Sequence, residues 1–244
     1  MFYFEKIHGK TIMKSDLLEE VEHFFTTRES VIKTKEEYFK ILADENKKLF
    51  ANYLNIDLKN FINPSQTHSV NIEIAKVGKS DYPDCDGLIL TNSEQGIFLN
   101  FADCTPVIFY DKKLKIGAIS HAGWRGTAGK ISALTVEKMV KDFSSNPADI
   151  KVLIGPAISL CCYDVGEDVL EKLTRTVEDK DGIFEKRDGK FFVDLKEINK
   201  RQLLEAGVKE IDVCPYCTVC DNDLFFSYRK ENATTNRHSA ILKL

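Results

Sequence analysis

Residues 101–121 read FADCTPVIFYDKKLKIGAISH. Two apolar runs flank a polar break at Lys112-Lys113, so this stretch predicts a β-hairpin. If the two lysines form a two-residue loop, Cys104 lies directly opposite His121. Opposed residues have Cβ atoms about 4.5–5.5 Å apart, which suits two ligands of one metal ion or a thiol and its base. Pro106 and the unfavoured Lys-Lys turn weaken this register, and a slip by one residue would separate the pair.

The segments around this hairpin alternate between short apolar runs and longer stretches with helical periodicity. The helical stretches cover residues 34–55, 131–143, 167–177 and 194–206. The short apolar runs cover residues 70–76, 87–91, 96–101, 106–110, 114–120, 151–154, 208–213, 224–228 and 239–242. Asp194 with Glu197 has a capping-box pattern, and Gly207 follows the last helix. Because strands and helices mix without a strict βαβ rhythm, we predict an α+β fold of mixed β-sheets flanked by helices.

Composition limits the class of protein. The chain has 244 residues, of which 43% are hydrophobic and 30% charged, as in ordinary globular proteins. No repeat or linker divides it, so we expect one domain over residues 1–244. The net charge of −4 argues against nucleic acid as a partner, because phosphate backbones need a basic surface. No window approaches the roughly 18 apolar residues of a membrane span, so we expect no membrane partner.

Cysteine usage indicates the compartment. The chain has seven cysteines, an odd number, and residues 1–6 lack the basic start of a signal peptide. A reducing compartment is therefore favoured over a disulfide framework, and we expect a cytoplasmic protein. Cys214, Cys217 and Cys220 resemble the start of an iron–sulfur run that lacks its fourth cysteine. We expect these three to be buried thiols near the site rather than a separate cluster, and Cys161-Cys162 to be structural.

His68, in the loop sequence SQTHS, completes a candidate metal site with Cys104 and His121. Two histidines and one cysteine with a fourth position open form a reasonable catalytic zinc site, and copper accepts the same ligands. A zinc ion would polarise an oxygen or lower the pKa of a bound water to about 7. The alternative for these residues is packing for the cysteine and ordinary hydrogen bonding for the histidines.

Several arginines are candidates for binding a small anion. Residues 121–130 read HAGWRGTAGK and lead from a strand into a helix, whose N-terminus with Arg125 could hold an anion. The alternative is a tight turn with Trp124 in the core, and no Walker A or Rossmann spacing is present. Arg28, Arg229 and Arg237 could each clamp phosphate by a bidentate contact, against the alternative of a solvated surface.

Together these segments resemble the family long called multicopper polyphenol oxidoreductases, or laccase-domain proteins. That family is now regarded as zinc-dependent purine nucleoside phosphorylases with adenosine deaminase activity. The matching segments are TTR at 26–28, QTH at 66–68, DG at 86–87, ADCTP at 102–106, HAGWRGT at 121–127, IGPAI at 154–158, CT at 217–218 and FSYR at 226–229. They span nearly the whole chain in the family's order, and the HAGWRG segment is highly specific.

The resemblance implies a fold related to certain cysteine hydrolases, and it places His68, Cys104 and His121 on the family's zinc ligands. The implied reactions are phosphorolysis of adenosine, inosine and methylthioadenosine, and deamination of adenosine. A purine nucleoside and inorganic phosphate would then be the partners. Asp103 would act as a catalytic acid beside Cys104 and His121, or would orient a ligand.

Two departures from the family pattern lie beside candidate anion-binding arginines. Glu29-Ser30 replace the usual glycines after Arg28, and Asn236 stands in the usual Thr-Gly-Arg before Arg237. These changes leave the details of substrate binding open. The sequence also leaves open the preferred nucleoside, the pathway, the oligomeric state and the residues that contact the base.

Three other functions remain as alternatives. In a cysteine hydrolase acting on an amide or peptidoglycan-type substrate, Cys104 would be the nucleophile and His121 its base. A multicopper phenol oxidase is disfavoured, because it needs many more histidines than the five in this chain. A binding module without catalysis is the third alternative, and an inert purified protein would support it.

Overall fold

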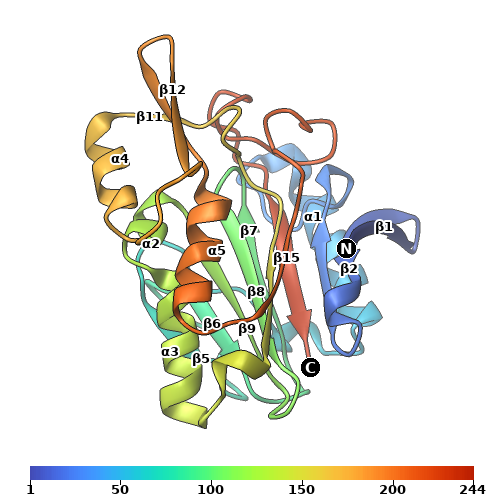
Figure 1. Ribbon diagram of the computed structural model, residues 1–244. Coiled ribbons are helices and arrows are strands. Elements are labelled where there is room, and N and C mark those ends of the chain that lie inside the picture. The colour runs from blue at the N-terminus through green and yellow to red at the C-terminus, as the bar shows by residue number, and fades with distance from the viewer.

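The computed structural model describes residues 1–244, and its largest elements are two six-stranded β-sheets (Figure 1). The strand order of the first sheet is β1-β2-β3-β15-β7-β4. Its strands are β1 (Phe2–Ile7), β2 (Lys10–Ser15), β3 (Glu22–Thr26), β4 (Phe61–Ile62), β7 (Gly96–Phe101) and β15 (His238–Lys243). Neighbouring strands are antiparallel except β4 and β7. The first three strands and the last strand of the chain therefore share one sheet.

The second sheet has the order β14-β10-β8-β9-β6-β5. Its strands are β5 (Ile72–Ile74), β6 (Gly87–Leu90), β8 (Thr105–Asp111), β9 (Ile116–Ala122), β10 (Ile150–Ile154) and β14 (Glu210–Val213). Two neighbouring pairs, β5 with β6 and β10 with β14, are parallel. Every residue of β8 and β9 is buried. These central strands are covered on both faces, which explains their continuous apolar sequence.

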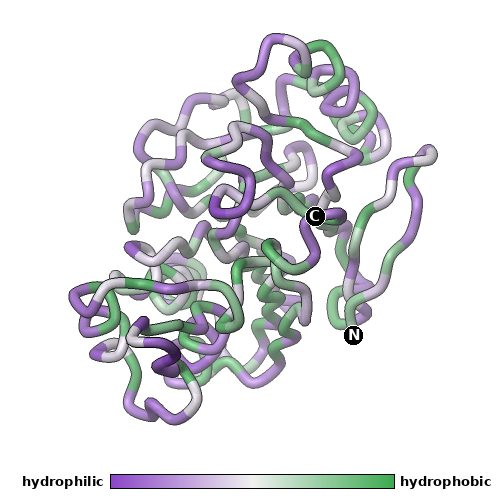
Figure 2. Tube along the Cα trace, turned by 90° about the horizontal axis from the view of Figure 1, so that it is seen from above, coloured by the Kyte–Doolittle hydropathy of each residue, from purple (hydrophilic) through white to green (hydrophobic).

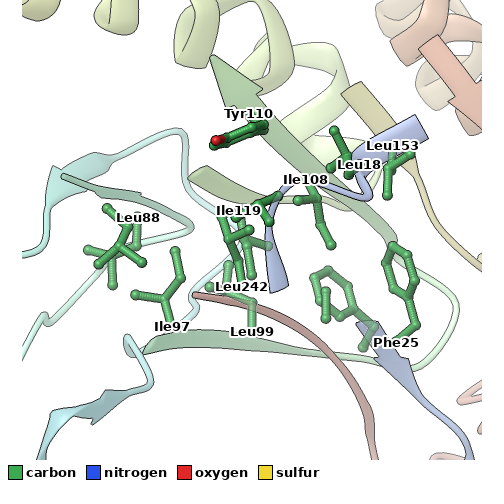
Figure 3. Close-up of a cluster of buried hydrophobic side chains, with 14 of the residues drawn as sticks. Leu18, Phe25, Leu88, Ile97, Leu99, Ile108, Tyr110, Ile119, Leu153 and Leu242 are labelled. Carbon is green, nitrogen blue, oxygen red and sulfur yellow. The ribbon is translucent and has the colours of Figure 1, made fainter. Parts of the chain in front are cut away.

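The inner faces of the two sheets pack against each other and form the main core (Figure 3). The first sheet contributes Phe25, Ile97, Leu99 and Leu242, and the second contributes Leu88, Ile108, Ile119 and Leu153. All eight side chains are fully buried. Burial of this apolar surface from both sheets is the dominant stabilising contribution, at roughly 25 cal/mol per Å².

Helices cover the two outer faces, so the molecule has four layers. α1 (Glu37–Tyr53) packs on the first sheet, where the rings of Phe50 and Phe24 lie 5.1 Å apart. α3 (Ile131–Phe143) and α5 (Leu195–Glu205) cover the second sheet through a separate apolar cluster (Figure 1). None of the helices is long and apolar enough to cross a membrane.

A smaller unit lies beside the second sheet. It contains α2 (Trp124–Ala128), α4 (Glu167–Thr174) and a three-stranded sheet of β11 (Asp164–Val165), β12 (Phe184–Arg187) and β13 (Lys190–Val193). Leu170, Leu173 and Val193 form its core, with Trp124 packed against them. This unit places α2, which directly follows β9, next to the end of the second sheet.

The predicted fold class and most of the predicted elements are confirmed. α3 has the predicted bounds, and α1, α4 and α5 lie inside their predicted ranges. The Asp194 side chain accepts the backbone N–H of Glu197 and so caps α5, as its pattern predicts. Gly207 has a φ of 92° just beyond the helix end. The left-handed conformation costs glycine little, which is why it suits this position.

The predicted hairpin is present, but its register is wrong by two residues. β8 and β9 pair so that Pro106, not Cys104, lies opposite His121. A shift of one residue would turn each side chain to the other face, whereas a shift of two preserves the faces. Cys104 lies just before β8, outside the paired residues of the hairpin.

The hairpin loop explains this shift. It has four residues rather than two, because the last ladder pair joins Asp111 to Ile116. The Asp111 carboxylate accepts the backbone N–H groups of Lys113 and Leu114 at 2.9 and 3.1 Å. Lys115 closes the loop with a φ of 53°. An aspartate that bonds to its own turn favours this longer loop over a two-residue one.

The strand predicted at residues 224–228 is wrong. This segment forms turns, in which the backbone N–H groups of Leu224 and Phe225 donate to the Asp221 carbonyl oxygen. Phe225 is buried in the main core and Phe226 in a small cluster. These apolar side chains therefore pack into the interior although their backbone forms an irregular loop. A run of apolar side chains without a partner strand does not make a sheet.

The first three strands were not predicted from the sequence. β1 and β2 form a hairpin whose turn residues His8 and Gly9 have φ values of 47° and 82°. Such a turn joins two antiparallel strands tightly. The hairpin lies at the rim of the molecule next to the N-terminus (Figure 2), and most of β1 is exposed or half-buried. Its sequence consequently lacks a strong apolar pattern.

Candidate metal centre

Three side chains with metal-ligating atoms meet near the end of β9. His121 lies on β9, Cys104 lies between β7 and β8, and His68 lies in the loop between β4 and β5. Their ligand atoms are all within 4.8 Å of one another. The two imidazole rings meet edge to face, with centroids 4.8 Å apart. Three distant segments of the chain thus supply one sulfur and two ring nitrogens to a common point.

A fourth residue, Asp86, is completely buried and holds two of these ligands in place. Its Oδ1 accepts hydrogen bonds from the ring Nδ1 of His121 at 2.7 Å and from the backbone N–H of His68 at 3.1 Å. Its Oδ2 accepts the backbone N–H groups of Thr67 and Ser69 at 3.0 and 2.8 Å. Because an ionised carboxylate only accepts, Nδ1 of His121 donates to Asp86, and Nε2 is the ring nitrogen left for a metal ion.

Hydrogen bonds keep the Asp86 carboxylate ionised. Burial raises its pKa, but the hydrogen bonds from His121 and from the Thr67 and Ser69 N–H groups lower it more, so the pKa lies well below its usual range. The loop that carries His68 therefore closes around a fixed negative charge. His68 itself adopts a φ of 64°, a left-handed conformation that the surrounding hydrogen bonds maintain.

The electrostatics of Cys104 and His121 are coupled. Burial raises the pKa of the Cys104 thiol, but His121 and His68 lower it further, to about 6. Burial lowers the pKa of His121, but the Cys104 sulfur and Asp86 raise it to about 9. The site thus favours a thiolate with a positive charge beside it. Thiolate is the form of cysteine that binds metal ions.

Gly123 leaves room for the two ligands next to it. A Cβ atom at this position would lie 2.9 Å from the Cys104 sulfur and 3.2 Å from a ring carbon of His68. Its φ of −66° is accessible to any residue, so the requirement for glycine here is one of space. The backbone after β9 approaches the ligand group so closely that any side chain would displace it.

The donor set fits a divalent metal ion. One thiolate and two imidazoles suit zinc and also copper, and a carboxylate behind a ligating histidine is a common arrangement at zinc sites. A site for several copper ions does not fit these residues. Of the other histidines, His23 bonds with both ring nitrogens to the backbone of Ser15 and Val21, His8 is exposed, and His238 is buried elsewhere.

The ligand group opens into a cavity of about 940 Å³. This volume lies at the upper end of the range for small-molecule sites, roughly 300–1,000 Å³. The candidate site residues that line it are His68, Asp103, Cys104, His121, Arg125, Arg229 and Arg237. A metal bound by the three ligands would therefore face a space large enough for a nucleoside-sized molecule.

The arginines at the cavity differ in their partners. Arg229 forms an ion pair with Asp164. Arg125 stacks on Trp124 at 4.4 Å and has no carboxylate partner. Arg237 donates only to the backbone carbonyl oxygens of Thr234 and Asn236. Arg125 and Arg237 thus bring positive charge to the cavity without a protein anion to neutralise it.

Arg28 lies outside the cavity lining, contrary to its prediction as a substrate-binding residue. Its guanidinium donates to Glu231 at 2.7 Å and covers the ring of Phe226 at 4.6 Å. Both partners come from the C-terminal loop, so Arg28 connects this loop to the segment after β3. Its partners explain its charge without any ligand.

Asp103 lies in the cavity wall, but both of its carboxylate oxygens are occupied. Oδ1 accepts the Thr218 hydroxyl at 2.6 Å and Oδ2 accepts the backbone N–H of Arg229 at 2.7 Å. Its φ of 83° is left-handed. These contacts make Asp103 a residue that positions Cys104 and the C-terminal loop, and they leave it poorly placed to donate a proton.

The sequence pointed to the three candidate ligands, which the structure brings together, but not to the other residues that organise the cavity. The sequence shows Asp86 only as part of a motif. Its one local signal is its position, as an acidic residue directly before a buried strand. Lys33, Tyr163 and Tyr228 also line the cavity. They come from loops without a periodic pattern, and only the folded chain brings them together.

Known proteins of similar sequence and structure indicate the family of this chain. The purine nucleoside phosphorylase YlmD of Geobacillus stearothermophilus is 36% identical over 212 residues, which cover 81% of this chain and 77% of that protein. The adenosine deaminase RL5 of an unknown prokaryotic organism is 30% identical over 200 residues, covering 77% and 76%. The crystal structure of hypothetical protein YfiH of Bacillus licheniformis superposes with a TM-score of 0.90 at 30% identity, covering 99% of this chain and 98% of that one.

A family model described as multi-copper polyphenol oxidoreductase laccase matches residues 40–244. The match runs from within α1 to the end of β15 and includes the three candidate metal ligands. The resemblance seen in the sequence motifs is thereby confirmed. On the extent of this match and the identity with its relatives, the chain belongs to the multi-copper polyphenol oxidoreductase laccase family.

Proposed function

We propose that this protein is a purine nucleoside phosphorylase that cleaves adenosine, inosine and methylthioadenosine with inorganic phosphate. The observation that carries the proposal is the ligand group of His68, Cys104 and His121 at a cavity that also holds the unpaired cations Arg125 and Arg237. Relatives named purine nucleoside phosphorylase support it. Both sheets share one core, so we also propose that residues 1–244 act as one catalytic unit.

In this mechanism the two arginines hold phosphate. Arg237 is half-buried at the cavity, and its guanidinium has N–H groups that the protein does not fully use. Arg125 enters from the start of α2. Charge-assisted, bidentate contacts of arginine suit phosphate oxygens. A phosphate oxygen then attacks C1′ of the ribose, the C–N bond to the base breaks, and the base leaves with the bonding electrons.

Aromatic side chains in the cavity can hold the base. Trp124, Tyr163 and Tyr228 line it and present ring faces or edges to a planar purine. Burial raises the pKa of Tyr163 to about 12, so its hydroxyl stays protonated and can donate a hydrogen bond. Orientation of the base and the phosphate on either side of C1′ supplies much of the rate acceleration.

The metal we propose is zinc, held by His68, Cys104 and His121. When bound, it supplies a Lewis acid that polarises a substrate oxygen or lowers the pKa of a water. The residues of the chain prepare for it. Asp86 keeps the proton of His121 on Nδ1, and Gly123 keeps the Cys104 sulfur accessible.

Deamination of adenosine is a second activity that we propose for the same cavity, since a relative is named adenosine deaminase. The competing cysteine hydrolase is favoured by one observation, the lowered pKa of Cys104 next to His121. That enzyme would retain its turnover after complete removal of metal. A zinc enzyme would lose turnover and regain it when zinc is restored.

The test is release of free base from adenosine, measured with and without phosphate, for wild type and His68→Asn. Asparagine tolerates the left-handed backbone of His68 but removes the imidazole. We expect turnover to fall by at least about 10³-fold and zinc to be lost from this site. His8→Asn is the matched control, because His8 is exposed and also left-handed. Unchanged turnover of His68→Asn would refute the role of the metal.

A further inference from the structure

A second group of potential metal ligands lies outside the cavity. Cys161, Cys162, Cys217 and Cys220 place their sulfur atoms within 4.8 Å of one another. None of them lines the cavity or contacts the His68, Cys104 and His121 group as a ligand. We expected Cys217 and Cys220 to be buried thiols rather than part of a cluster, and this is wrong: Cys220 is exposed, and both lie in one group with Cys161-Cys162. Cys161-Cys162 supply the partners that the Cys217–Cys220 segment lacks in sequence.

We propose that these four cysteines bind a single zinc ion as a closed tetrathiolate site with a structural role. Four sulfur ligands without an open position are typical of structural zinc sites, and Cys-x-x-Cys is a common spacing for half of such a site. The family comparisons do not carry this proposal. It depends on the geometry of these sulfurs and of the two turns that hold them.

The sulfur–sulfur distances agree with one metal ion and disagree with a disulfide. The Cys220 sulfur lies 3.6 Å from that of Cys161 and 3.5 Å from that of Cys162. A tetrahedron with Zn–S bonds of about 2.3 Å has edges of about 3.8 Å. A disulfide needs about 2.05 Å, and Cys220 is equally close to two candidate partners. An iron–sulfur cluster would hold the four sulfurs farther apart, since its own atoms lie between them.

Backbone hydrogen bonds fix the two turns relative to each other. Ala157 and Cys217 form a β-bridge, and the N–H of Thr218 donates to the Ala157 carbonyl oxygen at 3.1 Å. Within the first turn, the N–H of Cys162 donates to Ser159 at 2.9 Å. Within the second, the N–H of Cys217 donates to the Asp221 carboxylate at 2.8 Å. The protein therefore holds the four sulfurs near the required geometry through contacts that do not involve them.

The surroundings also suit a negatively charged metal–thiolate group. Arg187 donates to the carbonyl oxygens of Leu160 and Cys161, and Lys230 donates to that of Val219. Each cysteine pair thus has one cation beside it.

The position of the four cysteines indicates what a zinc ion would stabilise, because both turns contact Asp103 in the cavity wall. The first turn follows Ile158, which lines the cavity and donates its N–H to the Asp103 carbonyl oxygen. The second turn carries Thr218, which bonds to the Asp103 carboxylate. A zinc ion would join these turns and so fix the wall of the cavity from behind. It would take no part in the reaction.

The test is the zinc content of the full-length protein, measured by mass spectrometry after dialysis. We expect two zinc ions per chain in wild type, one in Cys220→Ser and one in His68→Asn. The two single variants lose different ions, so failure of the proposed active-site metal is distinguishable from failure of this site. Cys214→Ala is the control and should retain both ions, because Cys214 is buried apart from both groups. Equal zinc in Cys220→Ser and wild type, or iron in place of zinc, would overturn the proposal.

A second measurement covers the case in which Cys220→Ser does not fold. Wild-type protein is alkylated with iodoacetamide before and after a zinc chelator, and the peptides are identified by mass spectrometry. Cys161 and Cys220 are exposed, so without a metal they should react quickly. We expect both to be protected until the chelator is added. Rapid labelling before chelation, or a disulfide between any two of the four cysteines, would contradict the site.

Discussion

The two cysteine-containing groups of this chain differ in nearly every property of their surroundings. His68, Cys104 and His121 mix nitrogen with sulfur, lie around the buried Asp86 and open into a large cavity. The four cysteines of the second group have sulfur alone, lie on two turns and do not line that cavity. An incomplete ligand set beside a cavity is the arrangement of a catalytic metal, and a complete set on turns is that of a structural one.

The largest effect is expected when one sulfur ligand is removed from each group, which tests whether the two groups have separate roles. We expect Cys104→Ser to lose at least about 10³-fold in phosphorolysis, because the ligand set drops to two. Cys220→Ser should stay within about tenfold of wild type and lose thermal stability instead. Turnover and melting temperature, measured on both variants, check this. Equal losses of turnover would mean that the two groups do not have separate roles.

A smaller effect is expected from the carboxylate behind the ligands. Asp86→Asn keeps the size of the side chain but removes the charge that holds Nδ1–H of His121. We expect zinc affinity and turnover to fall by about 10–100-fold, as for other residues that orient metal ligands. Competition with a fluorescent chelator measures the affinity of this site. Asp81→Asn, at an exposed position, is the control, and a matching loss there would contradict the role of Asp86.

Space at the ligands can be tested with a matched pair of glycines. Gly123 and Gly166 both precede a helix, with φ values of −66° and −71°. Alanine at 123 would crowd the Cys104 sulfur, whereas alanine at 166 would meet only the Asp168 side chain. We expect Gly123→Ala to weaken zinc binding about tenfold and Gly166→Ala to have no effect on it. Tight zinc binding by Gly123→Ala would show that the loop after β9 can relax.

The smallest expected effect concerns the arginines that line the cavity beside His68, Cys104 and His121. Arg237→Met should raise the KM for phosphate several-fold to about tenfold with a smaller change in kcat, because a phosphate contact is lost. Arg28→Met should leave the KM for phosphate unchanged, since Arg28 pairs with Glu231. Initial rates over a phosphate series distinguish the two variants. A larger increase in the KM for phosphate in Arg28→Met than in Arg237→Met would assign the phosphate contact to Arg28 instead.

Much of this fold was predictable because its signals are local. The periodicity of α3 and the cap of α5 depend on neighbouring residues only, and both elements lie where the sequence indicates. Cys104 and His121 could be chosen as candidate ligands for a similar reason, because they lie at the open end of one hairpin. The hairpin register was not predictable, because the hydrogen bonds that the Asp111 carboxylate accepts stabilise a four-residue loop.

The remaining features depend on contacts between segments far apart in the sequence. By itself the sequence determined the residue types, the faces of the strands and the three candidate ligands. Only the tertiary structure decided that Asp86 bonds to His68 and His121 and that Arg28 pairs with Glu231 of the C-terminal loop. It alone also brings Cys161-Cys162 next to Cys217 and Cys220. The physical reason is that periodicity and turn chemistry act over a few residues, whereas hydrogen bonds and metal ligation join any groups that packing brings within about 3–4 Å.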